Sequence, residues 1–260
     1  MENWLLLRGL AREMRHWGTF RETLAAQLPG ARIECLDLPG TGTEHARKSP
    51  SRIAGITEDL RARWETLRAQ HPGSWNLLGM SLGGMVAMDW TSRHPDDFAS
   101  VVLVNTSAAN LAAPWRRMRL AVLPDIFRAL ISGDELERNR RILRATTRLV
   151  GESAREPIAK DWARIQAESP IARKTVLRQL WGASRFRAPP SLPIPALVVA
   201  AAEDPLCDPE CPRRLALRFG APLVIHPRAG HDLSLDDPEW LAAQVRAWID
   251  SRSRGPASAA

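Results

Sequence analysis

Short apolar runs alternate with longer amphipathic stretches along most of this chain of 260 residues, and that alternation limits the possible folds more than any other feature. We predict strands at residues 4–10, 31–40, 74–80, 98–105, 196–202 and 221–227. We predict helices at residues 17–28, 53–70, 82–93, 209–219 and 238–250. Strands separated by helices of about 10–15 residues indicate βαβ units. The expected fold class is therefore α/β, with a parallel sheet of about six strands.

The alternation stops between residues 110 and 187, where the pattern predicts helices and no strand. Glycines and prolines divide this stretch, namely Pro114, Pro124, Gly133, Gly151, Pro157 and Pro170. A proline-rich linker at residues 188–195 follows, and the alternation then resumes. We expect a core of residues 1–109 and 188–253, a helical cap or lid of residues 110–187, and a disordered tail at 254–260. A cap inserted there would lie over the strand ends, where open parallel sheets bind ligands.

The formal net charge of +7 is concentrated in the predicted cap. Residues 110–187 hold fifteen Arg and two Lys against eight Asp or Glu, a net charge of +9. The simplest interpretation is a solvated helical surface, and the functional alternative is a surface for an acidic acyl carrier. We expect no nucleic-acid partner, because no known binding motif occurs and aromatic residues do not alternate with the charges.

One serine lies in a setting that suits a nucleophile. Gly79-Met80-Ser81-Leu82-Gly83 matches G-x-S-x-G and sits between a predicted strand and a predicted helix. This arrangement is the nucleophile elbow, a turn so sharp that only very small residues fit two positions before and after the serine. A hydroxyl needs a base to become nucleophilic, and the base needs a carboxylate to orient it.

Both partners occur in the expected chain order, serine, then acid, then histidine. Asp204 follows the predicted strand at 196–202, and His231 lies in the loop before the last helix. Glu203 and Asp208 remain alternatives for the acid. Asp232 next to the histidine is expected to point away or to bond backbone. Asp236 and Asp237 are expected to be helix caps.

With these residues in place the chain resembles the α/β-hydrolase superfamily over about residues 3–250. DLPGTG at residues 37–42 and LLLRGLAREMRHW at 5–17 are similar to two loops of that family, although Arg8 stands where the family usually has histidine. The resemblance implies an oxyanion hole formed by the backbone N–H groups of Leu10 and Leu82. It also implies that the first two strands of the family are missing, which leaves six strands, all parallel.

Several other residues are candidates for the substrate pocket. They are His16, Trp17, Trp115, Trp162 and Trp181. A structural role is the alternative for His16, and packing in core or cap is the alternative for the tryptophans.

Cofactors are not indicated. Gly40-x-Gly42 lacks the third glycine of a dinucleotide site, and the spacing of Cys207 and Cys211 is not that of a zinc site, so we expect no cofactor and no metal. Three cysteines without framework spacing indicate reduced thiols in a cytoplasmic protein. The sequence has no apolar run near the roughly 20 residues of a membrane span, and its N-terminal apolar run is too short for a signal peptide.

The expected function is that of a serine hydrolase of the carboxylesterase or thioesterase type (EC 3.1), acting on a small acyl ester or thioester. Ser81 also excludes the aspartate nucleophile of dehalogenases and epoxide hydrolases within the superfamily. The same triad could instead serve acyl transfer, carbon–carbon bond hydrolysis or a lyase reaction. A relative that binds a small ligand without catalysis is the second alternative.

Overall fold

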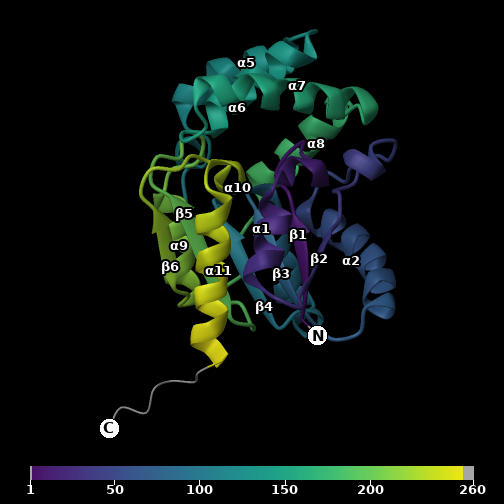
Figure 1. Cartoon of the computed structure of the whole chain (residues 1–260), viewed down its shortest axis with the longest axis vertical. Coiled ribbons are helices and arrows are strands. Elements are labelled where there is room, and N and C mark those ends of the chain that lie inside the picture. The colour runs from purple at the N-terminus through teal and green to yellow at the C-terminus, as the bar shows by residue number, and fades with distance from the viewer. Residues whose placement is uncertain (1, 254–260) are drawn as a thin grey trace.

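A central parallel sheet organises the molecule, as a computed structural model covering residues 2–253 shows (Figure 1). Its strands are β1 (Glu2–Leu7), β2 (Arg32–Cys35), β3 (Ser74–Met80), β4 (Ser100–Val104), β5 (Ala196–Ala201) and β6 (Leu223–His226). They pair in the order β2-β1-β3-β4-β5-β6, and every pair is parallel. The prediction of an α/β fold with six parallel strands is confirmed.

Helices cover both faces of the sheet because the strands are apolar on both sides. The helices outside the stretch between β4 and β5 are α1 (Phe20–Gln27), α2 (Ile53–Gln70), α3 (Leu82–Arg93), α9 (Glu210–Phe219), α10 (Leu233–Asp236) and α11 (Pro238–Ser253). Trp4 and Leu6 of β1 pack in the core cluster with α1 and α11. Leu5 and Leu7 of the same strand pack in the cluster with α2, α3 and α9. This two-sided burial is typical of parallel sheets.

The stretch between β4 and β5 is helical and contains α4 (Pro114–Arg117), α5 (Leu123–Ile131), α6 (Glu135–Thr146), α7 (Glu152–Glu168) and α8 (Arg173–Arg185). Helices α5, α6 and α7 lie beyond the carboxyl ends of the strands, at the top of Figure 1. Within them, Leu143, Trp162 and Ile165 belong to a small buried cluster separate from the two core clusters at the sheet. Among the described residues, the stretch between β4 and β5 therefore contains helices and no strand.

Within residues 2–253, four short 3-10 helices join these elements, at Met14–Trp17, Gly42–Glu44, Pro95–Asp97 and Leu120–Val122. The largest difference from the predicted boundaries is at the second strand, which spans Arg32–Cys35 instead of 31–40. The first strand also ends earlier, at Leu7 rather than at residue 10. In both cases the apolar run continues into a loop that is buried beside the strand ends, so hydrophobicity alone predicts a strand that is too long.

Pro157 lies inside α7 and does not separate two helices. The predicted disordered tail at 254–260 lies outside the described residues. Among residues 2–253, no helix combines the length and the apolar character needed to cross a membrane.

Candidate active site

Ser81 occupies the turn between β3 and α3, and its backbone has a positive φ of 56° together with a ψ of −115°. The turn is closed by two glycines. A Cβ atom on Gly79 would lie 2.3 Å from the carbonyl oxygen of Gly83, and one on Gly83 would lie 2.2 Å from that of Leu7. Neither contact is possible for a side chain, which explains the glycines at both positions.

The three residues predicted as a triad lie within hydrogen-bond distance of one another. The Oγ of Ser81 is 2.9 Å from Nε2 of His231. The Nδ1 of the same ring is 2.7 Å from Oδ2 of Asp204. The other carboxylate oxygen of Asp204 accepts hydrogen bonds from the backbone N–H groups of Leu206 and Cys207, each at 2.8 Å. The acid is thus held at both oxygens.

Asn105, directly after β4, fixes the loop that carries the histidine. Its Nδ2 donates to the carbonyl oxygen of His231 at 2.9 Å, and its Oδ1 accepts from the backbone N–H of Ala201 at 2.9 Å. The residue has a positive φ of 44°, a conformation that asparagine tolerates better than most residues. This residue was not predicted, because a single asparagine at a strand end carries no distinctive signal in the sequence.

The pKa of His231 depends on its burial and on the charges around it. Burial lowers the pKa of His231, but the negative charge of Asp204 and its hydrogen bond outweigh burial, so the pKa is raised above its ordinary value. The carboxylate therefore favours the protonated imidazole that forms when a hydroxyl loses its proton to the ring.

Two backbone N–H groups in the elements around Ser81 have no hydrogen-bond acceptor among residues 2–253. Leu82 is the first residue of α3, so its N–H has no acceptor within that helix. Within residues 2–253 the N–H of Leu10 also donates no hydrogen bond. A Cβ atom on Gly9 would be 3.1 Å from the Cβ of Ser81, which places the loop of Leu10 against the serine. Both leucines line the cavity described below.

Arg8, the departure from the family pattern, is paired with Asp232. Its two terminal nitrogens donate to the two carboxylate oxygens at 3.1 and 2.7 Å. It also donates to Ser234 at 2.8 Å. Burial works against the charge of Asp232, but Arg8 outweighs it and holds the pKa of that carboxyl below its usual value. The expectation that Asp232 bonds backbone was wrong, because its carboxylate pairs with Arg8, which lies 224 residues earlier in the chain.

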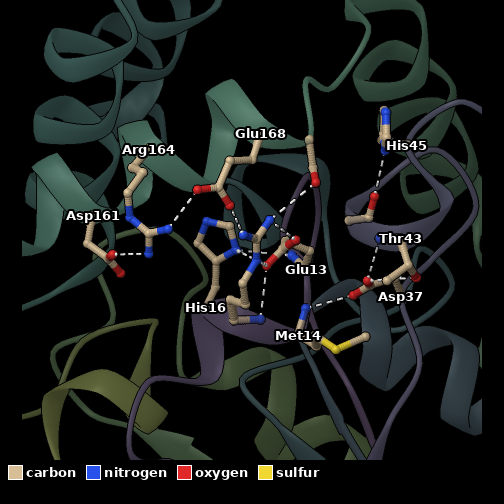
Figure 2. Close-up of polar contacts among 12 residues, drawn as sticks. Glu13, Met14, His16, Asp37, Thr43, His45, Asp161, Arg164 and Glu168 are labelled. Carbon is tan, nitrogen blue, oxygen red and sulfur yellow. Dashed lines mark hydrogen bonds and ion pairs between the residues drawn. The ribbon is translucent and has the colours of Figure 1, made fainter.

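The loop after β1 is fastened on its outer side by two polar networks (Figure 2). Asp37, the first residue of DLPGTG, accepts hydrogen bonds from the N–H groups of Met14 at 2.7 Å and Thr43 at 2.9 Å. In the second network Arg15 bonds both Glu13 and Glu168 of α7. The loop that carries Leu10 is thus tied to the core on one side and to the helical stretch on the other.

A cavity of about 810 Å³ opens above Ser81. It is bounded below by the loop after β1 and by the ends of β3 and β4, and above by residues of α4 to α8. Ser81 and His231 lie in its wall, as do Leu10, Arg12 and Trp181. Its size suits a small organic ligand. Within residues 2–253, no group of three or more His, Cys, Asp or Glu side chains is arranged to hold a metal ion.

The five candidate pocket residues lie in different places. Trp181 lines the cavity and is 54% exposed. His16, Trp17 and Trp162 are buried and do not line it. His16 accepts a hydrogen bond from the N–H of Glu13 and meets Trp162 edge to face with ring centroids 5.1 Å apart. Trp115 is 62% exposed and also lies outside the cavity wall.

The neighbouring carboxylates have other partners. Glu203 is exposed, and Asp208 pairs with Arg116 and caps α9 through the N–H of Glu210.

Asp237 bonds the N–H of Trp240 in the first turn of α11, as expected of a cap. Asp236 is not a helix cap, which corrects the prediction. Its carboxylate accepts from the backbone N–H of Gly230 and from those of residues 148–150, and so fastens the histidine loop to the helical stretch.

Comparison with known proteins identifies the family and the fold. A sequence model of the alpha/beta hydrolase family matches residues 4–244. The enol-lactonase from Burkholderia xenovorans LB400 has a similar structure, with a TM-score of 0.75 and 21% identity. That comparison covers 96% of this chain and 91% of the lactonase.

Two curated relatives match shorter stretches. The pimeloyl-[acyl-carrier protein] methyl ester esterase of Aromatoleum aromaticum is 36% identical over 109 residues, or 38% of this chain and 40% of the relative. The biotin biosynthesis bifunctional protein BioHC of Teredinibacter turnerae is 30% identical over 122 residues, or 43% of this chain and 20% of the relative. The chain therefore spans less than half the length of these relatives.

Proposed function

The chain belongs to the α/β-hydrolase family, and on that premise we propose that it is a serine hydrolase that cleaves a carboxylic ester or thioester through an acyl-enzyme on Ser81. One observation carries the proposal. It is the continuous hydrogen-bonded line from the Oγ of Ser81 through both ring nitrogens of His231 to the carboxylate of Asp204.

The first half of the reaction forms the acyl-enzyme. His231 takes the proton of Ser81 as its Oγ attacks the acyl carbonyl carbon, and Asp204 stabilises the imidazolium. The N–H groups of Leu10 and Leu82 bind the oxygen as it becomes negative. The tetrahedral intermediate collapses, the bond to the leaving alcohol or thiol breaks, and His231 gives that group its proton.

The second half repeats the chemistry with water. His231 removes a proton from a water molecule, whose oxygen attacks the acyl carbon bonded to Ser81. The intermediate collapses again, the acid leaves, and the proton returns to the serine oxygen. The helical stretch at residues 110–187 acts as a cap in this scheme, because helices α5 to α8 wall the cavity above the serine and restrict entry of water.

An acyl chain linked to an acyl carrier is the substrate that we propose within this class. Two features support it: the net charge of +9 on residues 110–187, and the esterase relative whose name specifies a carrier-linked methyl ester. An acidic carrier would be attracted by such a surface, and salt would screen the attraction. We therefore expect added sodium chloride to lower turnover of a carrier-linked ester and to leave turnover of a free 4-nitrophenyl ester unaffected. If turnover of the carrier-linked ester did not fall, we would abandon this part of the proposal.

The first experiment is intact-mass measurement after exposure to a fluorophosphonate probe. We expect one adduct on the native chain and none on Ser81→Ala. Turnover of an ester and thioester panel should then be lost in Ser81→Ala. A folded native chain that takes no adduct would contradict the acyl-enzyme mechanism and favour binding of a small ligand without catalysis.

A further inference from the structure

Arg12 lies in the same loop as the proposed oxyanion donor Leu10, two residues further along the chain. The backbone of this loop is well held. The N–H of Arg12 donates to the carbonyl oxygen of Gly9 at 3.3 Å, and the N–H of Ala11 donates to Oε1 of Gln179 in α8 at 3.0 Å. Arg12 therefore has a defined position in the wall of the cavity that contains Ser81.

The side chain of Arg12 is buried without a partner for its charge. The residue is only 8% exposed, and its guanidinium lies over the ring of Trp162, 4.0 Å from the centroid. Among residues 2–253 it forms no ion pair and no side-chain hydrogen bond, and its Nη2 atom is fully buried. Arginines this buried normally face a carboxylate, because an isolated charge is costly to remove from water.

Among the described residues, the cavity wall holds no unpaired carboxylate that could neutralise this charge. Five arginines line the cavity, namely Arg8, Arg12, Arg117, Arg138 and Arg173, against two carboxylates, Glu135 and Asp232. Both carboxylates are already engaged, Asp232 by Arg8 and Glu135 by Arg138. Arg117 donates to the hydroxyl of Ser107 and to two carbonyl oxygens, none of which carries a full negative charge.

The excess of positive charge affects the pKa of Arg12 itself. Burial, and then the positive charge of Arg8, lower the pKa of Arg12 to about 9, although Asp232 opposes them. An anion placed beside the guanidinium would relieve both effects. A guanidinium also offers a planar set of N–H donors that matches the two oxygens of a carboxylate or a phosphate group.

We propose that Arg12 is a specificity-determining residue that binds an anionic oxyacid group, a carboxylate or a phosphate, carried by the substrate of this cavity. The role in ester cleavage rests on the proposed function, but recognition of the anion does not. The substrate class is then an acyl ester or thioester with a second, negatively charged end, and the cavity of about 810 Å³ has room for both ends.

The kinetic test compares esters that differ only in charge. The substrates are mono-4-nitrophenyl glutarate, the 4-nitrophenyl ester of 4-phosphonobutanoate, and neutral 4-nitrophenyl pentanoate. For Arg12→Met we expect kcat/KM to fall about 10- to 100-fold on a charged ester, the range for a lost hydrogen bond to a charged group. The neutral ester should change less than twofold. The charged ester whose kcat/KM falls, the carboxylate or the phosphonate, identifies the anion that Arg12 binds. Equal kcat/KM for all three esters in both proteins would overturn the proposal.

Controls separate a specific contact from a general effect of charge or folding. Arg218→Met removes an exposed arginine of α9 that does not line the cavity, and it should leave the charge preference unchanged. An equal loss there would overturn the proposal. Arg12→Lys keeps the positive charge and replaces Arg12→Met in this test if that variant does not fold. The preference of Arg12→Lys for charged over neutral esters should drop severalfold, because an ammonium cannot make paired contacts. An unchanged preference would refute a guanidinium-specific contact.

A binding measurement separates this proposal from the proposed function. We expect calorimetry to detect glutarate or inorganic phosphate binding to Ser81→Ala, and to lose it when Arg12→Met is added. Binding that depends on Arg12 in a chain whose serine takes no fluorophosphonate would keep this inference and refute the hydrolase. Labelling and turnover without any Arg12-dependent anion binding would keep the hydrolase and refute this inference.

Discussion

The ion pair between Arg8 and Asp232 allows a quantitative test of the structure. The two side chains are 3% and 5% exposed, and two hydrogen bonds join them directly. Arg8→Met removes the cation and leaves Asp232 with the hydroxyl of Ser234 as its remaining side-chain donor. Removing one partner of a buried pair costs about 3–5 kcal/mol. This is a large part of the roughly 5–15 kcal/mol that stabilises a typical folded protein.

Urea unfolding at pH 7.5 measures the effect. With a slope of about 3 kcal/mol per M urea, the midpoint of Arg8→Met should lie about 1–1.7 M below that of the native chain. The double variant Arg8→Met, Asp232→Leu removes both charges and should recover most of the loss, because apolar side chains can replace a buried pair at little cost. A native-like midpoint in the single variant, or no recovery in the double, would refute the reasoning.

The pH dependence supplies an independent check. In the native chain the pKa of Asp232 is lowered, so its ionisation contributes stability above the ordinary carboxyl pKa, and that contribution is lost as pH falls through the lowered value. Without Arg8, burial still raises the pKa of Asp232, and the hydrogen bond from Ser234 and the charge of Arg12 are what remain to lower it. We therefore expect a higher pKa than in the native chain, so protonation relieves the variant in acid. The difference in unfolding free energy between native and Arg8→Met should therefore shrink as pH falls below neutrality. A constant difference would contradict the assigned ion pair.

Two further predictions concern the triad and the turn. Because the pKa of His231 is raised and the proposed mechanism needs the neutral ring, kcat/KM should rise with pH through a limb above the ordinary value of 6.5. Asp204→Asn should lower the rate about 10⁴-fold, and a limb at or below 6.5 in the native chain would contradict the assignment. Gly83→Ala would place a Cβ 2.2 Å from the oxygen of Leu7, so it should destabilise the chain by about 1–3 kcal/mol or more. Gly133→Ala, with nothing within 4 Å, is the matched control, and similar melting of the two variants would contradict the crowded turn.

The helices and the sheet could be predicted well because they depend on local patterns. The stretch at 53–70 was predicted to the residue, since apolar spacing and its end at His71-Pro72-Gly73 are both read from neighbouring positions. The loop after β1 was harder. Its apolar residues continue the pattern of the strand, and only contacts with α8 and the strand ends determine where the strand stops.

For the candidate site, the serine turn and the order of serine, acid and histidine could be predicted from the chain alone, because short motifs at strand ends encode them. Three acidic residues follow the fifth strand, and the folded structure shows that Asp204 bonds His231, while Glu203 is exposed and Asp208 pairs with Arg116. The tertiary structure also decided that Arg8 is neutralised while Arg12 is not. That difference depends on partners more than 200 residues away, which spacing along the chain cannot reveal.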